Sequence, residues 1–187
     1  MTAPPFAKKK IIATTSLAGC FGCHMSLLDI DLKLLDLVEV VQFDRSPLTD
    51  IKTISQRVDI GLIEGGVCND ENVHVLKSFR DHCDILVSLG ECAIMGGLPA
   101  LRNDIPLREC LEEAYLNVPT SVPGKRLIPH HVDLPKILDR VYPCHEIVKI
   151  DYYIPGCAPS AEAIWKALTS ILFGKGEALG KEFIRYD

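Results

Sequence analysis

The segment KIIATTSLAGCFGCHMSLLDID, residues 10–31, contains the pattern that decides the fold. Its beginning, KIIATTS, is apolar and β-branched, which predicts a buried strand over 10–16. From residue 24 onward apolar side chains recur at helical spacing, so we expect a helix over 24–37. The turn between them contains Cys20 and Cys23, three positions apart. A strand, a turn and a helix in this order are typical of one unit of an α/β protein.

The same alternation continues along the chain. We expect further strands over 38–43, 59–67, 84–92 and 146–157. We expect a loop and helix over 47–58, and helices over 71–83, 106–117 and 159–174. Ser160 is the expected cap of the last helix and Gly174 its expected stop. Strands that alternate with helices predict a parallel sheet with helices on both faces, and crossover handedness narrows this to a doubly wound, flavodoxin-like sheet of about five strands.

We expect residues 1–187 to form a single domain, a size that suits one compact core. Five prolines between residues 118 and 145 predict an irregular excursion there, with at most one short helix over 134–141. A charged tail is expected from about 175 to 187.

Composition restricts the partners. The formal net charge is −5, and Lys8–Lys10 form the longest basic tract, so nucleic acid is not an expected partner. No apolar run approaches the ~20 residues of a membrane helix. The apolar run after the lysines is short and is interrupted at Thr14, so we interpret it as a strand, not as a signal peptide, and expect a cytoplasmic protein with no membrane insertion. The hydrophobic content of 48% fits a chain that buries part of its surface against a partner.

The chain contains eight cysteines, which in a reducing compartment indicate metal or redox chemistry more than disulfides. Working residues of such sheets lie just past the carboxyl ends of the strands. Five cysteines follow expected strands: Cys20, Cys23, Cys68, Cys92 and Cys157. Cys83, Cys110 and Cys144 lie elsewhere and are expected to be structural, while the role of Cys68 stays open.

The cysteine spacing favours an iron–sulfur cluster without excluding other sites. A C-x-x-C pair also occurs in zinc sites and thioredoxin-like redox proteins. Redox chemistry of the pair alone would leave Cys92 and Cys157, in their glycine turns, without a role. Structural zinc commonly takes two closely spaced pairs, whereas here one pair is joined by two distant single cysteines. This arrangement favours [4Fe–4S] over zinc, which remains the alternative.

A flavin is the rival interpretation of the first turn. The segment ATTSLAG, residues 13–19, has the Ser/Thr/Gly composition of a loop that holds the phosphate of FMN in flavodoxin-like sheets. Cys20 follows at once, and a cluster there would compete for the space. We expect His24 to face solvent or an interface and not to act as a ligand.

Three motifs together resemble a known family. CFGCHMSLLD, GECAIMGG and IPGCAP occur in the order found in the small subunit of [NiFe] hydrogenases, and the resemblance runs from about residue 10 to 173. It implies that Cys20, Cys23, Cys92 and Cys157 bind one [4Fe–4S] cluster proximal to a nickel–iron centre. An EGG turn, residues 64–66, stands where the family has V-E-G. Oxygen-tolerant members have two extra cysteines at positions that here are Gly22 and Gly97, which implies an ordinary four-cysteine cubane.

The resemblance is to the short, cytoplasmic type, as in soluble NAD-reducing hydrogenases. It implies an electron-transfer subunit between the NiFe site of a large subunit and an iron–sulfur and flavin diaphorase that reduces NAD, with no NiFe site in this chain. The cluster edge and helix 24–37 would pack against the large subunit. Two alternatives remain: the cluster subunit of respiratory complex I, which typically has two adjacent cysteines instead of C-x-x-C, and a flavodoxin-like FMN or zinc module.

Overall fold

The computed structural model describes residues 8–120, 122, 124, 126–175 and 178–183. Its main sheet has five parallel strands in the order β2-β1-β3-β5-β7. The strands are β1 (Lys10–Ser16), β2 (Val41–Phe43), β3 (Val58–Glu64), β5 (Cys83–Leu89) and β7 (Tyr152–Ile154). The order reverses beside β1, as in doubly wound sheets. The predicted α/β fold is confirmed.

The strand register aligns the carboxyl ends of four strands in one row. Ser16 pairs with Glu64, Glu64 pairs with Leu89, and Leu89 pairs with Ile154. Because all of these pairings are parallel, the segments that follow these four residues leave the sheet at the same edge. That edge is where the cysteine-containing turns begin.

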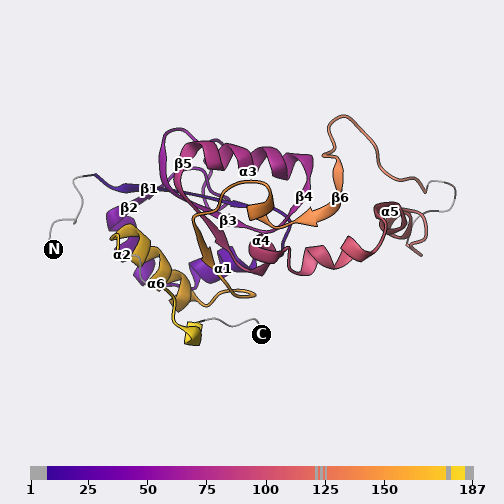
Figure 1. Cartoon of the computed structure of the whole chain (residues 1–187). Helices are drawn as coiled ribbons and strands as arrows, with labels where there is room; N and C mark the ends of the chain where they lie inside the picture. The colour runs from indigo at the N-terminus through magenta and orange to yellow at the C-terminus, as the bar shows by residue number, and fades with distance from the viewer. Residues whose placement is uncertain (1–7, 121, 123, 125, 176–177, 184–187) are drawn as a thin grey trace.

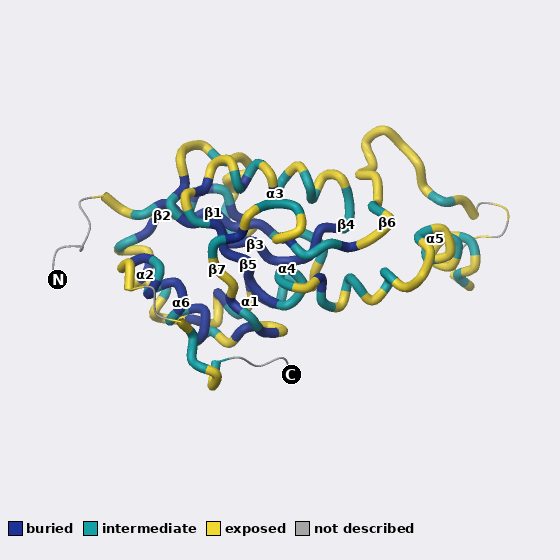
Figure 2. The backbone as a smooth tube through the Cα atoms, in the orientation of Figure 1, coloured by how far each residue is buried: buried dark blue, intermediate teal, exposed yellow. Residues whose placement is uncertain are grey.

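Helices cover both faces of the sheet (Figure 1). On one face lies α3 (Asp70–His82), and on the other lie α1 (Gly22–Leu28), α2 (Lys33–Val40) and α6 (Ala161–Leu172). Successive residues of a strand point to opposite faces: Ile12 packs in the core that contains Leu168 of α6, while Ile11 packs in the core that contains Phe79 of α3. Figure 2 shows the resulting buried centre along β1, β3 and β5.

Side-chain caps define where two of these helices begin. The Asn69 side chain accepts a hydrogen bond from the backbone N–H of Asn72 at 2.7 Å at the start of α3. The Ser160 hydroxyl accepts one from Ala163 at 3.2 Å at the start of α6, as predicted. Each cap is worth about 1 kcal/mol. Gly174, with φ +65°, follows the last helical turn in the place expected for a stop.

The remaining elements lie outside the main sheet. They are β4 (Val67–Asn69), α4 (Glu91–Met95), η1 (Leu98–Asp104), α5 (Leu107–Tyr115), β6 (Ile137–Tyr142), η2 (Cys144–Glu146) and η3 (Lys181–Phe183). β4 and β6 form a separate antiparallel pair. Figure 1 shows β6 and α5 projecting away from the layers around the main sheet.

The structure corrects several expected elements. The helix expected over 24–37 is two helices, since the chain breaks at Asp31, where φ is +58°. No helix lies within 47–57, and the helix expected over 134–141 is instead strand β6, because its backbone pairs with β4. The strands expected over 38–43 and 146–157 shrink to three residues each, β2 and β7.

The expected tail is only partly described, because residues 176–177 and 184–187 lie outside the described ranges. Residues 181–183 form η3. No described helix combines the length and the apolar character needed to cross a bilayer.

Candidate metal centre

The turn after β1 holds Cys20 and Cys23 at the sheet edge. After Ser16 the chain is fixed to the end of β3, because Leu17 donates its N–H to the Glu64 carbonyl at 2.7 Å and Ala18 forms a two-bond bridge with Gly66. Phe21 then takes a left-handed conformation, φ +69°, and starts α1. As a result Cys20 is exposed while Cys23 lies buried in the first helical turn.

Gly65 makes the close approach between these two segments possible. Its φ is +88°, and a Cβ there would lie 2.8 Å from the Leu17 carbonyl carbon and 2.9 Å from the Ala18 nitrogen. These neighbours are backbone atoms, which cannot rotate away as a side chain can. A glycine at the EGG turn is therefore required for the turn that leads to Cys20.

Cys92 and Cys157 lie on two turns that are hydrogen-bonded to each other. The N–H of Gly90 donates to the Ile154 carbonyl at 2.8 Å, and the N–H of Glu91 donates to the Gly156 carbonyl at 3.0 Å. These bonds continue the pairing of β5 with β7 past the ends of the strands. A Cβ on Gly90 would clash with the Cys23 sulfur, so the Cys92 turn also borders the C-x-x-C turn.

Two of the four predicted ligand cysteines, Cys23 and Cys92, have raised thiol pKa values. The pKa of Cys23 rises to about 12, first because the thiol is buried and then because Glu64, Cys92, Cys20 and Cys157 add negative charge nearby. Burial also raises the pKa of Cys92, and the charges of Cys157, Cys20 and Glu64 act in the same direction. The hydrogen bonds between the Cys92 and Cys157 turns, and the approach of Gly90 to the Cys23 sulfur, show that the three cysteine turns adjoin one another at this edge. Four thiolates there would repel one another unless a cationic group lay between them, which fits the donor set of an iron–sulfur cluster.

Two backbone N–H groups donate hydrogen bonds to the sulfurs of Cys20 and Cys92. Gly22 donates its N–H to the Cys20 sulfur at 3.4 Å. The N–H of Leu98 forms a hydrogen bond that favours the thiolate of Cys92 and opposes the effect of burial on its pKa.

Within the described ranges, no group of three or more His, Cys, Asp or Glu side chains is arranged to hold a single metal ion.

The expectation for His24 was wrong. Its side chain is fully buried, and its backbone N–H donates to Glu64 Oε2 at 3.1 Å. Imidazole Nδ1 contacts the same carboxylate oxygen, and Nε2 lies 2.9 Å from the Thr14 hydroxyl. That hydroxyl lies 2.7 Å from the hydroxyl of Ser46. One sequence signal was available for Glu64: it is a charged residue that ends an apolar strand in the same row as the cysteine turns.

The same contacts bear on the flavin interpretation. Thr14 lies in the segment expected to hold a phosphate, but it is 1% exposed and its hydroxyl is hydrogen-bonded to His24 and Ser46. A hydroxyl in this position is occupied inside the protein, so it does not face a phosphate at the surface.

The other cysteines have separate surroundings. Cys83 and Cys144 are buried, and burial raises the pKa of each thiol to about 12, which agrees with a core role. Cys83 begins β5 and does not lie in a helix. Cys110 is half-buried in α5. Cys68 lies in β4, where its thiol donates to the Asn72 side chain at 3.3 Å.

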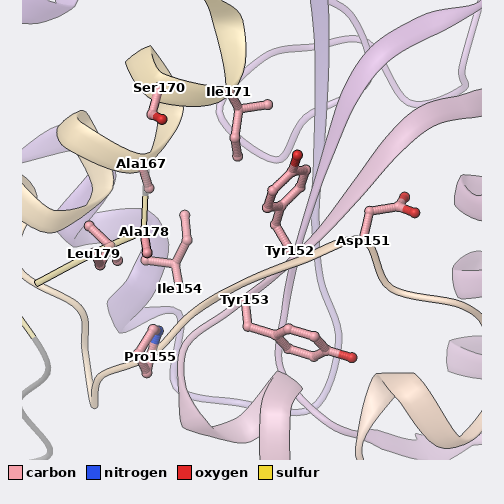
Figure 3. A pocket seen from close by; sticks show the side chains of 10 residues that line it. All are labelled: Asp151, Tyr152, Tyr153, Ile154, Pro155, Ala167, Ser170, Ile171, Ala178 and Leu179. Atoms are coloured by element: carbon pink, nitrogen blue, oxygen red, sulfur yellow. The ribbon is translucent and has the colours of Figure 1, made fainter. Parts of the chain in front are cut away.

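A cavity of about 430 Å³ lies between β7 and α6 (Figure 3). Tyr152 and Ile154 line it from the strand, and Ile171 lines it from the helix. Its lining is mainly apolar and includes no cysteine. Pro155, two residues before Cys157, also lines this cavity, so it borders the last cysteine turn without containing a cysteine.

Comparison with known proteins defines the family to which this chain belongs. Residues 20–171 match the family described as NADH ubiquinone oxidoreductase, 20 Kd subunit, and the chain belongs to this family. Within it, the chain is a homologue of hydrogenase subunits. It is 51% identical over 177 residues to the delta subunit of the NAD-reducing hydrogenase HoxS of Cupriavidus necator, covering 94% of this chain and 85% of the relative.

Two further similarities support this placement. The chain is 37% identical over 171 residues to a subunit of the F420-non-reducing hydrogenase of Methanothermobacter thermautotrophicus, covering 90% of this chain and 55% of the relative. A chain in the crystal structure of an NAD+-reducing [NiFe]-hydrogenase in the H2-reduced state matches with a TM-score of 0.93 and 52% identity. That match covers 96% of this chain and all of the other. The resemblance identified from the three cysteine motifs is confirmed.

Proposed function

We propose that this chain is the electron-transfer small subunit of an NAD-reducing [NiFe] hydrogenase and that Cys20, Cys23, Cys92 and Cys157 bind one [4Fe–4S] cluster. The observation that carries the proposal is geometric: the three turns that contain these cysteines leave the aligned ends of β1, β5 and β7, the Cys92 and Cys157 turns are hydrogen-bonded to each other, and the Cys23 sulfur lies against Gly90. Four cysteines on three separate turns are the donor set that such a cluster requires.

The chain contributes the surroundings of the bound group. When bound, a [4Fe–4S] cluster accepts and releases electrons one at a time. The chain holds Cys23 in a buried position and leaves Cys20 and Cys157 at the surface, so one side of the site is shielded from water and the other side is open. The N–H groups of Gly22 and Leu98 donate toward thiolate sulfurs, and such donors raise the reduction potential.

The proposed partners are a large subunit that contains the NiFe site and iron–sulfur and flavin diaphorase subunits that reduce NAD. Support comes from the names of the relatives with 51% and 52% identity. Large apolar side chains beside the cysteine turns are exposed, including Met25, Met95 and Leu98, and an exposed apolar surface of this kind is typical of an interface. Because NAD is the proposed acceptor, we place the complex in the cytoplasm.

A complex I subunit is the alternative within the same family. The C-x-x-C pair and the 51% identity to a hydrogenase subunit favour the hydrogenase. Activity of the purified complex distinguishes the two: the hydrogenase proposal requires H2-dependent reduction of NAD+, and NADH–quinone reduction without hydrogen uptake contradicts it.

The ligand assignment is tested by Cys157→Ser, with Cys110→Ser as the matched control, since the latter thiol lies in α5 away from the site. The intact complex is purified without oxygen, and iron and acid-labile sulfide are measured with the electron paramagnetic resonance (EPR) spectrum of the reduced protein. We expect Cys157→Ser to remove the native cluster signal and Cys110→Ser to preserve it. Equal effects of the two substitutions would show that the assignment is wrong.

The same preparation tests the two remaining alternatives. Zinc found in a one-to-one ratio with the chain, without acid-labile sulfide, would support a structural zinc site and contradict the cluster. Fluorescent flavin released from this subunit on denaturation, again without sulfide, would support the FMN module.

A further inference from the structure

We propose that Glu64 and His24 are positioning residues that clamp the C-x-x-C turn to the end of β3 and so set the geometry in which Cys20 and Cys23 bind the cluster. This inference rests on the proposed function. It assigns a role to a buried polar pair that lies outside the four proposed ligands.

The first half of the clamp is the Glu64 carboxylate. Glu64 is the last residue of β3 and is 2% exposed, so its side chain leaves the sheet in the row from which the cysteine turns begin. Its Oε2 accepts the backbone N–H of His24 at 3.1 Å and also contacts imidazole Nδ1. One carboxylate oxygen therefore fixes both the backbone and the side chain of the residue that follows Cys23.

The second half is the His24 imidazole, which is held on several sides. Nε2 lies 2.9 Å from the Thr14 hydroxyl of β1, so the ring bridges two neighbouring strands through their side chains. The Phe21 ring stacks on the imidazole with centroids 4.7 Å apart and planes 4° apart. Phe21 has φ +69°, a conformation that a residue with a bulky side chain rarely adopts.

These contacts form a single connected set. The left-handed Phe21 lies between Cys20 and Cys23 and determines the direction of the turn, and its ring is supported by the imidazole. The imidazole in turn is supported by Glu64 and Thr14. Because His24 and Glu64 are almost completely buried, water does not replace a lost partner, and removal of the carboxylate leaves buried donors unpaired. The turn then relaxes, and the two thiols lose their fixed separation.

The test uses Glu64→Ala and Glu64→Gln in the intact complex, with Asp59→Asn as the control. Asp59 lies near the opposite end of β3, where its carboxylate accepts the Ile11 N–H at 2.8 Å and pairs with Lys10. The control therefore removes a carboxylate of the same strand, β3, that accepts a backbone N–H of β1 at the opposite end from the cysteine turns. Iron and acid-labile sulfide per chain, the EPR spectrum of the reduced protein, and the rate of iron loss to a ferrous chelator are measured.

We expect Glu64→Ala to lower iron and sulfide at least twofold. Glu64→Gln keeps an oxygen that accepts the His24 N–H, so it should restore most of the iron content, but with a changed EPR line shape and at least threefold faster iron loss. Asp59→Asn should match the unsubstituted (parent) protein in iron and sulfide content, in EPR spectrum and in the rate of iron loss.

Parent-like iron content, spectrum and iron-loss rate in Glu64→Ala would overturn the clamp. If Glu64→Ala does not accumulate, Glu64→Gln decides, and a parent-like spectrum and loss rate in that variant overturn the clamp equally. An effect of Asp59→Asn as large as that of Glu64→Gln also overturns it, because the role would then be general stabilisation. A parent protein without iron and sulfide refutes the proposed function instead, so the two failures are distinguishable.

Discussion

Gly65→Ala should destabilise the protein much more than the addition of a single methyl group suggests. At φ +88° an alanine is strained by about 1–3 kcal/mol. The new Cβ would also lie 2.8 Å from a backbone carbon of Leu17, whereas ordinary contact begins at 3.4 Å, so the segments must separate by 3.4 − 2.8 = 0.6 Å. Overpacking of this kind costs about 1–3 kcal/mol more.

The matched control is Gly174→Ala. Gly174 also has a positive φ, +65°, but a Cβ there meets nothing within 4 Å. This substitution therefore imposes backbone strain of about 1–2 kcal/mol without a clash. We expect Gly65→Ala to lower the melting temperature by roughly 2–12 °C more than Gly174→Ala, since 1 kcal/mol corresponds to about 2–4 °C for a chain of this size.

The assay is thermal unfolding of the chain, followed by circular dichroism, with iron content of the complex measured in parallel. The displaced backbone lies at Leu17 and Ala18, immediately before the Cys20 turn, so Gly65→Ala should also lower iron content while Gly174→Ala leaves it unchanged. Equal losses of stability in the two variants would refute the reasoning, because the close approach of Gly65 to Leu17 would then be without consequence.

Three further outcomes are expected from other parts of the molecule. Burial alone would raise the pKa of Asp151, but hydrogen bonds from Arg80 and from the Leu86 N–H outweigh burial and lower that pKa. The carboxyl group therefore binds its proton more tightly in the unfolded chain than in the folded one, and the folded state loses stability as the pH falls below about 4. Asp151→Asn should reduce this loss of stability in an acid titration. Leu168→Ala, at a fully buried site in α6, should lower the free energy of unfolding by about 2–5 kcal/mol in urea titration, and a loss under 1 kcal/mol would contradict the packing. Cys83, buried and with its pKa raised to about 12, should resist iodoacetamide at pH 8 until the chain unfolds, as read by mass spectrometry, and rapid labelling of folded protein would contradict its burial.

The parts of the fold that the sequence predicts well are those decided by local pattern. The central strands β1, β3 and β5 are short, mainly apolar or β-branched runs followed by glycine- or cysteine-containing turns, and the structure places each within about three residues of its expected bounds. The last helix has its own cap in Ser160, and its start was found for that reason. These signals lie within a few neighbouring residues, so a single sequence is sufficient.

The features that were missed depend on residues far apart in the chain. Strand β6 exists because it pairs with β4, some 70 residues earlier, and its own pattern resembles a short helix. Likewise His24 is polar and follows a cysteine in a turn, which suggests exposure. Its burial depends on Glu64 at the end of another strand, and the local sequence contains no sign of that contact.

The two outermost strands of the sheet, β2 and β7, are only three residues long, while the interior strands β1, β3 and β5 have seven each. A sheet margin this short exposes few unpaired N–H and C=O groups, and therefore gives another polypeptide little on which to add a strand. The protein can therefore contain long apolar strands in the interior of its sheet while its outer strands offer little surface for edge-to-edge aggregation during synthesis. If the proposed complex forms, the short outer strands leave helices and turns as the surfaces for binding the other subunits.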